Sequence, residues 1–137
     1  MPLKLIIGVV LIAHGIGHVL GYFPIFGWAR TDGWSADSWA LTGLTGSTVT
    51  NVLGLALWTV AMVTFVVAGL GVLGIWVPVT WIRPLAVIGA VASIAGIVLF
   101  WEAFPAMTSR IGALVIDIIV LWAVIVGHWP ADDVVPG

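Results

Sequence analysis

The sequence contains no cysteine and few charged residues, and each shortage excludes a class of protein. Without cysteine, the chain itself forms no disulfide, thiolate metal site or dithiol redox centre. Charged residues make up 7% of the chain, whereas soluble domains carry about 25%, so a water-facing surface could not be covered. The net charge is −2 and the basic residues do not cluster, which argues against nucleic acid as a partner. The composition therefore indicates a protein whose solvent is the lipid bilayer.

What the sequence does have is long apolar runs. Hydrophobic residues make up 62% of the chain, and about 20 apolar residues suffice to span a bilayer as a helix. Backbone polar groups in lipid must be satisfied within the segment, so each run should be an α-helix. We predict an all-α fold, a single transmembrane domain over residues 1–137 that forms a four-helix bundle. The expected spans are 4–23, 52–76, 84–104 and 111–129.

Prolines fall at the expected ends of these spans. Proline lacks a backbone donor and disfavours helix in the residue before it. Pro24 and Gly27 are therefore expected to close the first span, Pro105 to start the turn before the fourth, and Pro130 to end the fourth. Pro78 and Pro84 are expected to bracket a short turn between the second and third spans.

Four spans place both termini on one side of the membrane, which we call the terminal side; the opposite surface is the far side. Lys4 and Arg83 fall on the terminal side. Arg30 and Arg110 fall on the far side, so the positive-inside rule does not choose an orientation. We expect a multi-pass protein of a bacterial or archaeal cell membrane with cytoplasmic termini.

The one long connection, residues 24–51, is rich in tryptophan. Within it, residues 35–41 are expected to form a short helix lying in the membrane interface, with Ser35 as its N-cap. This loop is interpreted as a lid anchored among the lipid headgroups. The alternative is a docking surface for a partner protein or a gate over an internal site.

Small residues four positions apart allow membrane helices to approach closely. We expect these pairs to pack within one bundle; the alternative is the interface of a homo-oligomer or of a larger membrane protein complex. The pairs are Gly17 with Gly21, Gly89 with Ser93, and Ala92 with Gly96.

Two histidines, His14 and His18, lie one helical turn apart inside the first span. Ionisable residues inside a membrane are costly, face the bundle interior and are usually functional. At about 1.5 Å per residue, His18 lies about 6 Å and His14 about 12 Å from the far end of the span. Asp117 enters the fourth span about 9 Å from the same surface, at a depth between the two histidines. We therefore expect these three residues to meet in one intramembrane pocket.

Two further polar residues belong to the far half of the bundle. Glu102 is expected to end the third span and Asn51 to open the second. Glu102 is therefore a fourth candidate for binding a cofactor. Ser93 is the only serine deep in a span, and no base can be placed beside it, so nucleophilic catalysis has little support.

The pocket admits several interpretations. Two histidines at positions i and i+4 can bind one metal ion, with Asp117 as third ligand or as the group that orients a ring, which would suit zinc, iron or copper. A quinone site needs fewer specific groups than a metal site: an imidazole donor, a carboxylate and an apolar, aromatic cleft. Haem is disfavoured, because two histidines on one turn cannot bind it from opposite faces and His128 lies at the other mouth. The remaining interpretations are a self-satisfied structural pair and a proton path.

The first span, residues 5–23 with His14-Gly15 at its centre, resembles the first helix of DoxX-like membrane proteins. Members of that family are four-helix chains of similar length, often with a basic residue where His18 stands. The end of the second span, residues 68–74, and the turn leading to Arg83 are also similar, although many members have an acidic residue near the position of Asn51. The resemblance implies association with membrane redox systems, including quinone-linked sulfur oxidation in some members.

We therefore predict a small membrane subunit associated with a redox system, with a pocket of His14, His18, Asp117 and Glu102 that binds a transition metal or a quinone. One alternative is a structural accessory subunit of a larger complex with no chemistry of its own. Another is a small transporter or proton-conducting protein. The sequence leaves open whether the chain is an enzyme.

Overall fold

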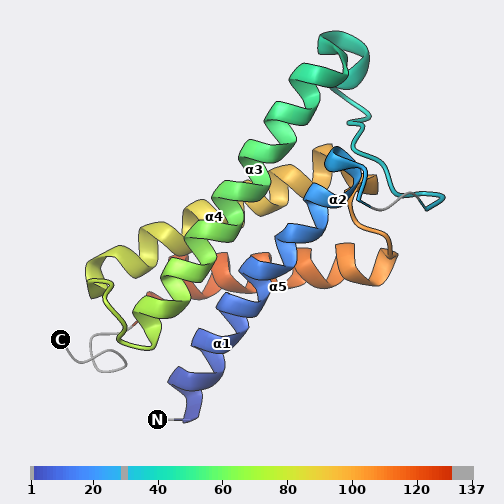
Figure 1. Cartoon of the computed structure of the whole chain (residues 1–137). Coiled ribbons are helices and arrows are strands. Elements are labelled where there is room, and N and C mark those ends of the chain that lie inside the picture. Colours follow the sequence, from blue (N-terminus) through green and yellow to red (C-terminus); the bar gives the residue numbers. More distant parts are fainter. Residues whose placement is uncertain (1, 29–30, 131–137) are drawn as a thin grey trace.

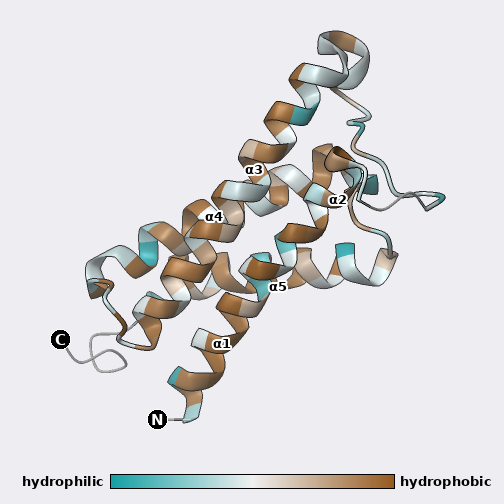
Figure 2. Ribbon diagram, viewed as in Figure 1, coloured by the Kyte–Doolittle hydropathy of each residue, from teal (hydrophilic) through white to brown (hydrophobic). Residues whose placement is uncertain are grey.

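The computed structural model describes residues 2–28 and 31–130, and all regular structure in these residues is helical (Figure 1). Four segments are long and apolar enough to cross a membrane, which confirms the predicted all-α architecture of four spans. Hydrophobic residues run along all four segments (Figure 2). The segments are Pro2–Phe26, Thr42–Val72, Val79–Leu99 and Met107–Ile125.

The first span consists of three consecutive helical pieces. These are α1 (Pro2–Gly17), the 3₁₀ turn η1 (His18–Gly21) and α2 (Tyr22–Phe26). Pro24 does not end the span as expected, because it lies in the first turn of α2, where a missing N–H costs nothing. The end comes instead at Gly27, whose left-handed φ of 67° lets the N–H of Trp28 bond back to the carbonyl of Phe23.

The second span, α3 (Thr42–Val72), begins ten residues before the expected start at residue 52. Threonines there bond back to carbonyls one turn earlier, Thr45 to Leu41 and Thr50 to Gly46, so their hydroxyls are satisfied within this helical stretch. Gly46 interrupts the helix with φ 80° and ψ 163°. At about 1.5 Å per residue, α3 exceeds the thickness of a bilayer core of about 30 Å. Its first turns accordingly extend beyond the other helices (Figure 1).

The last two spans begin earlier than expected. α4 (Val79–Leu99) contains Pro84, which was expected to precede the helix; the proline lies close to the N-terminus and removes a single backbone bond. α4 ends at Phe100 (φ −117°, ψ 58°) and is followed by the 3₁₀ turn η2 (Trp101–Ala103) rather than by helix up to residue 104. α5 (Met107–Ile125) starts directly after the extended Ala106 and ends four residues before the predicted residue 129.

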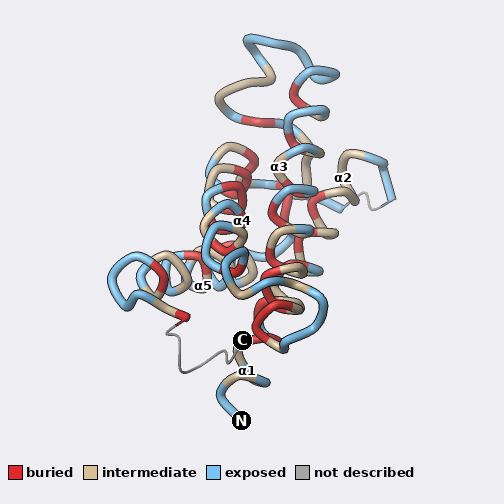
Figure 3. The backbone as a smooth tube through the Cα atoms, turned by 90° about the vertical axis from the view of Figure 1, so that its left-hand side faces the viewer, coloured by how far each residue is buried: buried red, intermediate tan, exposed pale blue. Residues whose placement is uncertain are grey.

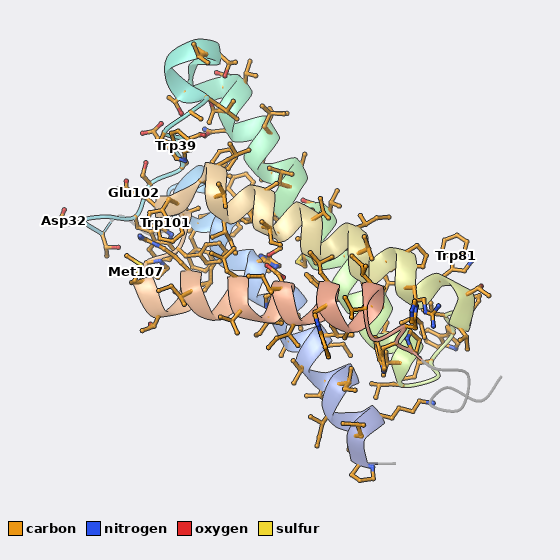
Figure 4. All side chains as sticks on the ribbon, turned by 180° about the vertical axis from the view of Figure 1, so that it is seen from behind. Asp32, Trp39, Trp81, Trp101, Glu102 and Met107 are labelled. Atoms are coloured by element: carbon orange, nitrogen blue, oxygen red, sulfur yellow. The ribbon has the colours of Figure 1, made fainter. Side chains whose placement is uncertain are left out.

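The expected interfacial helix over residues 35–41 was wrong, because these residues form bends and turns. Besides local bonds among these residues, such as Asp37 N to Ser35 Oγ, three side chains of the loop donate to carbonyls at or just after the end of α4. Trp34 Nε1 donates to the carbonyl of Ala103, and Trp39 Nε1 donates to that of Val98. Ser38 Oγ donates to the carbonyl of Leu99, and each of the three distances is 2.7 Å. Carbonyls at a helix C-terminus lack partners within the helix, and in an apolar environment they must find them elsewhere. The loop therefore lies across the end of α4, where Trp39, Trp101 and Glu102 gather while Trp81 lies at the opposite end (Figure 4).

The helices pack in the order α1, α3, α4, α5, and the buried residues lie on their facing sides (Figure 3). Within the described residues, α1 and α5 stand at the two edges of this arrangement and do not pack closely along their length. Glycines allow the close contacts. A Cβ on Gly15 would lie 2.9 Å from the carbonyl oxygen of Met62, and one on Gly96 would lie 2.5 Å from the Trp58 ring. Small residues therefore pack within the bundle, as expected, except that Gly17 has open space beside it.

Substituting Gly96 should destabilise the α3–α4 contact. Gly96→Ala forces a methyl group against the fully buried Trp58 ring, and overpacking of this kind costs about 1–3 kcal/mol. Gly43→Ala is the matched control, since no atom lies within 4 Å of a Cβ at that helical position. The free energy of unfolding, measured by denaturant titration in detergent micelles, should fall only for Gly96→Ala. Equal stability of the two variants would contradict this packing.

Candidate functional site

Asp117 of α5 lies at the centre of the bundle and is fully buried. Its Oδ1 lies 2.7 Å from Nε2 of His14 on α1, and its Oδ2 lies 2.5 Å from Oγ of Ser93 on α4. The hydroxyl of Ser93 donates to the carboxyl group, and the imidazole of His14 bonds to its other oxygen. One side chain thus joins three of the four spans.

The order of these groups decides which chemistry is open to them. The carboxylate lies between the hydroxyl and the imidazole, because both contact Asp117. A serine nucleophile instead needs the imidazole as its immediate neighbour, to take the hydroxyl proton. The cluster of Ser93, Asp117 and His14 is therefore an interhelical polar network, and it lacks the arrangement for acyl transfer.

His18 lies one turn from His14, with the two ring centroids 5.0 Å apart, and its ring packs against aromatic side chains. It stacks on Trp58 and Phe65 of α3, at centroid distances of 5.9 and 6.2 Å, and meets the edge of Phe104. The residue is 1% exposed. Among the described residues, neither of its ring nitrogens has a hydrogen-bond partner, and Trp58 Nε1 beside it has none either.

An unpartnered imidazole is costly in such an environment. Leaving a buried polar group unsatisfied costs about 1–3 kcal/mol, and more than 90% of buried polar groups in proteins generally have partners. A buried polar group with no partner therefore calls for an explanation, such as a water molecule or a ligand that reaches it.

The histidines form one wall of a groove between α1 and α5. Its volume is about 420 Å³, and it opens at the side of the bundle between the two helices that do not pack closely. No atom lies within 4 Å of a Cβ at Gly17 or Gly112, so these glycines leave the groove wide. Its lining consists of Val10, Ala13, His14, Gly17, His18, Leu20, Phe104, Ser109, Gly112, Ala113 and Ile116.

Arg110 fixes the far end of this groove. Its Nε and Nη2 both donate to the carbonyl of Phe104, at 2.9 and 2.7 Å, and its guanidinium lies 5.5 Å from the centre of the Trp101 ring. These contacts hold Phe104 against His18 and Trp58. The arginine thus satisfies a backbone carbonyl and positions an aromatic wall, and its charge is turned away from the groove lining.

Not all of the expected site residues meet. His14, His18 and Asp117 come together, but Glu102 is exposed and lines a separate hollow with Asp37, Ser38 and Trp39 near the loop. Its position in the turn η2, after α4 has ended, directs it away from the bundle interior. Among the described residues, no group of three or more His, Cys, Asp or Glu side chains could hold a metal ion.

Ser93 is the site residue that sequence reasoning missed. It was noted as the only serine deep in a span but was considered only as a nucleophile without a base, and not as a donor to Asp117. A hydroxyl in a membrane helix can also bond to its own backbone, as Thr64 does here to Val60 O, so the serine alone does not indicate a partner on another helix. Trp58, which lies inside the second span, is fully buried against His18, Phe100 and Phe104.

The bond between His14 and Asp117 should be measurable as an energetic coupling between α1 and α5. We expect His14→Leu and Asp117→Leu each to destabilise the protein, since each leaves a buried polar partner unsatisfied. The double variant should lose less free energy of unfolding than the two single variants lose together, and the difference, the coupling energy, should be about 1–2 kcal/mol. Unfolding titrations of the four proteins in detergent would give this value. Additive losses would show that the two side chains do not interact in the folded protein.

The chain was also compared with known proteins. No family model matches it, and no curated protein and no solved structure was found to match it.

Proposed function

We propose that this chain is a small integral membrane protein of a redox system and that it binds a quinone in the groove between α1 and α5. The observation that carries the proposal is His18: a buried imidazole with no hydrogen-bond partner among the described residues, lying just beneath a groove that opens sideways. A quinone carbonyl is an acceptor of the kind that this ring lacks. The open space at Gly17, which lines the same groove, leaves room for such a ligand beside His18.

The lining favours an uncharged, flat head group. No lysine or arginine lines the groove, so a phosphate head group would meet no positively charged partner there. Phe104 offers its ring at the groove wall. Ligand sites of this type combine apolar and aromatic walls with a few placed polar groups.

The metal version of the prediction has less support from the side-chain geometry. The carboxylate of Asp117 contacts the imidazole of His14 and the hydroxyl of Ser93, which suits a group that orients a ring better than one that shares an ion with both imidazoles. In the part of the chain that the structure describes, no group of three or more His, Cys, Asp or Glu side chains could hold a metal ion. The metal site stays a prediction of the sequence.

A bound quinone would supply two-electron redox chemistry, and the residues of this chain would bind and orient it. His18 would donate to one carbonyl. His14, held by Asp117 through Nε2, presents a fixed ring edge to the groove, and Ser93 keeps the carboxylate in place. Because this chain has no cysteine, it offers no dithiol of its own to exchange electrons with the quinone, and we place the redox partner in another protein.

Proton conduction, an alternative raised by the sequence, would need a polar path to both membrane surfaces. On the terminal side of His14 the described core is a cluster of apolar residues. Its buried members are Leu11, Phe65, Ala68, Val72, Ile82, Ala86, Ala90 and Val124. The polar network therefore supports a binding site better than a path through the bundle.

The variant His18→Phe tests the proposed function. It keeps the stacking on Trp58 and Phe65 but removes the donor, so binding of a decyl-substituted benzoquinone should weaken at least tenfold, or about 1.4 kcal/mol. Binding is measured by quenching of tryptophan fluorescence in phosphatidylcholine nanodiscs. Stability should be unchanged or higher, because two unpartnered buried nitrogens are removed.

The matched control is His128→Asn, which alters an exposed histidine at the terminal end and should leave quinone binding as it is. Asparagine tolerates the positive φ of 52° at this position. If the wild-type protein retains no more quinone than empty nanodiscs do, the proposed function is wrong. A stability loss in His18→Phe with unchanged binding would assign His18 a purely structural role.

A further inference from the structure

A second groove lies next to the first along the same two helices. Its volume is about 270 Å³, and every residue that lines it is apolar. Val10 of α1 and Ile116 of α5 line both grooves, so the two adjoin at these side chains. The lining consists of Ile6, Ile7, Val10, Leu11, Ile116, Ile119, Val120, Ala123 and Trp129.

Together the two grooves form one amphipathic surface groove, here called the combined groove, along one side of the bundle. The end toward the far side contains His14, His18 and Ser109, and the end toward the terminal side is entirely apolar. This polarity matches a molecule with a polar head and a long hydrocarbon tail. Ile6 precedes His14 by eight residues in the helical first span, which corresponds to about 12 Å along the helix.

The terminal end of the combined groove is held in place by hydrogen bonds from Arg83. Arg83 of α4 donates from Nε to the carbonyl of Trp129 at 3.2 Å and from Nη2 to that of Pro130 at 2.9 Å, and it also bonds to the carbonyl of His128. These bonds fasten the segment after α5 to the start of α4. Trp129 thereby closes the apolar groove at a defined point.

We infer that the tail of the quinone lies in this second groove, pointing from His14 and His18 toward Trp129 and filling the space between α1 and α5. This inference rests on the proposed function, since the head group must be bound first. It adds a direction and a length preference. A tail long enough to reach Trp129 gains apolar contacts along its whole length, and a longer tail must leave the groove.

The inference can be tested by blocking the second groove alone. Ala123→Phe places a ring in the apolar groove, whereas Ile118→Phe, on the same helix, alters a side chain that is 59% exposed and lines neither groove. The ligands are a benzoquinone with a decyl tail and the same benzoquinone with a methyl group instead, both assayed in phosphatidylcholine nanodiscs. We expect Ala123→Phe to weaken decyl-quinone binding at least tenfold and methyl-quinone binding less than twofold. Ile118→Phe should change neither.

A second variant keeps the test decisive if Ala123→Phe fails to fold. Ile6→Trp obstructs the same groove from α1 and should reproduce the loss for the decyl quinone. A quinone carrying a photoreactive group at the tip of a decyl tail should label the peptides containing Ile6 or Trp129.

The outcomes separate the two proposals. Labelling of far-side peptides, or equal binding of the decyl quinone by Ala123→Phe, Ile6→Trp and wild type, would overturn the inference while leaving the head-group site intact. Equal weakening of both quinones would also overturn it. Failure of both quinones to bind wild type would overturn the proposed function itself, and the tail site with it.

Discussion

The structure depends on a carboxylate that has been taken out of water. Asp117 is fully buried, and an unsatisfied charge in a low-dielectric interior costs several kcal/mol. Its two oxygens are satisfied by His14 from α1 and Ser93 from α4, so the three helices must keep their depth and rotation relative to one another. The bond to His14 matters most, because it joins the two helices that otherwise do not pack closely. This polar contact therefore sets the width of the groove between them.

The rest of the far half is built around aromatic rings. Trp58 is surrounded by His18, Phe100 and Phe104, and two glycines, Gly21 and Gly96, give its indole room. Backbone carbonyls at this end accept hydrogen bonds from side chains of the loop and from Arg110. These carbonyls belong to residues 98, 99, 103 and 104. A loop without regular structure is thus tied firmly to the bundle, and it shields the end of α4 where helical bonding has stopped.

The depths of His14 and Asp117 could be predicted from the sequence because a helix rises by a constant amount per residue, so counting from the span ends is enough. Ser93 could not be assigned in the same way, since a hydroxyl is satisfied equally well by its own helix. The start of α3 was placed too late because threonines that bond to their own backbone look like loop residues in a sequence. The groove itself depends on which helices are neighbours. Apolar periodicity does not specify that α1 packs on α3 and leaves α5 at the other edge.

The sideways opening between α1 and α5 has a consequence for access. A molecule that reaches His14 by this route is already dissolved in the hydrocarbon phase, so it arrives by diffusion in two dimensions within a leaflet. Water-soluble compounds are excluded by solubility before any side chain discriminates against them. Occupancy then follows the mole fraction of the compound in the bilayer, and its concentration in the surrounding solution matters only through partitioning.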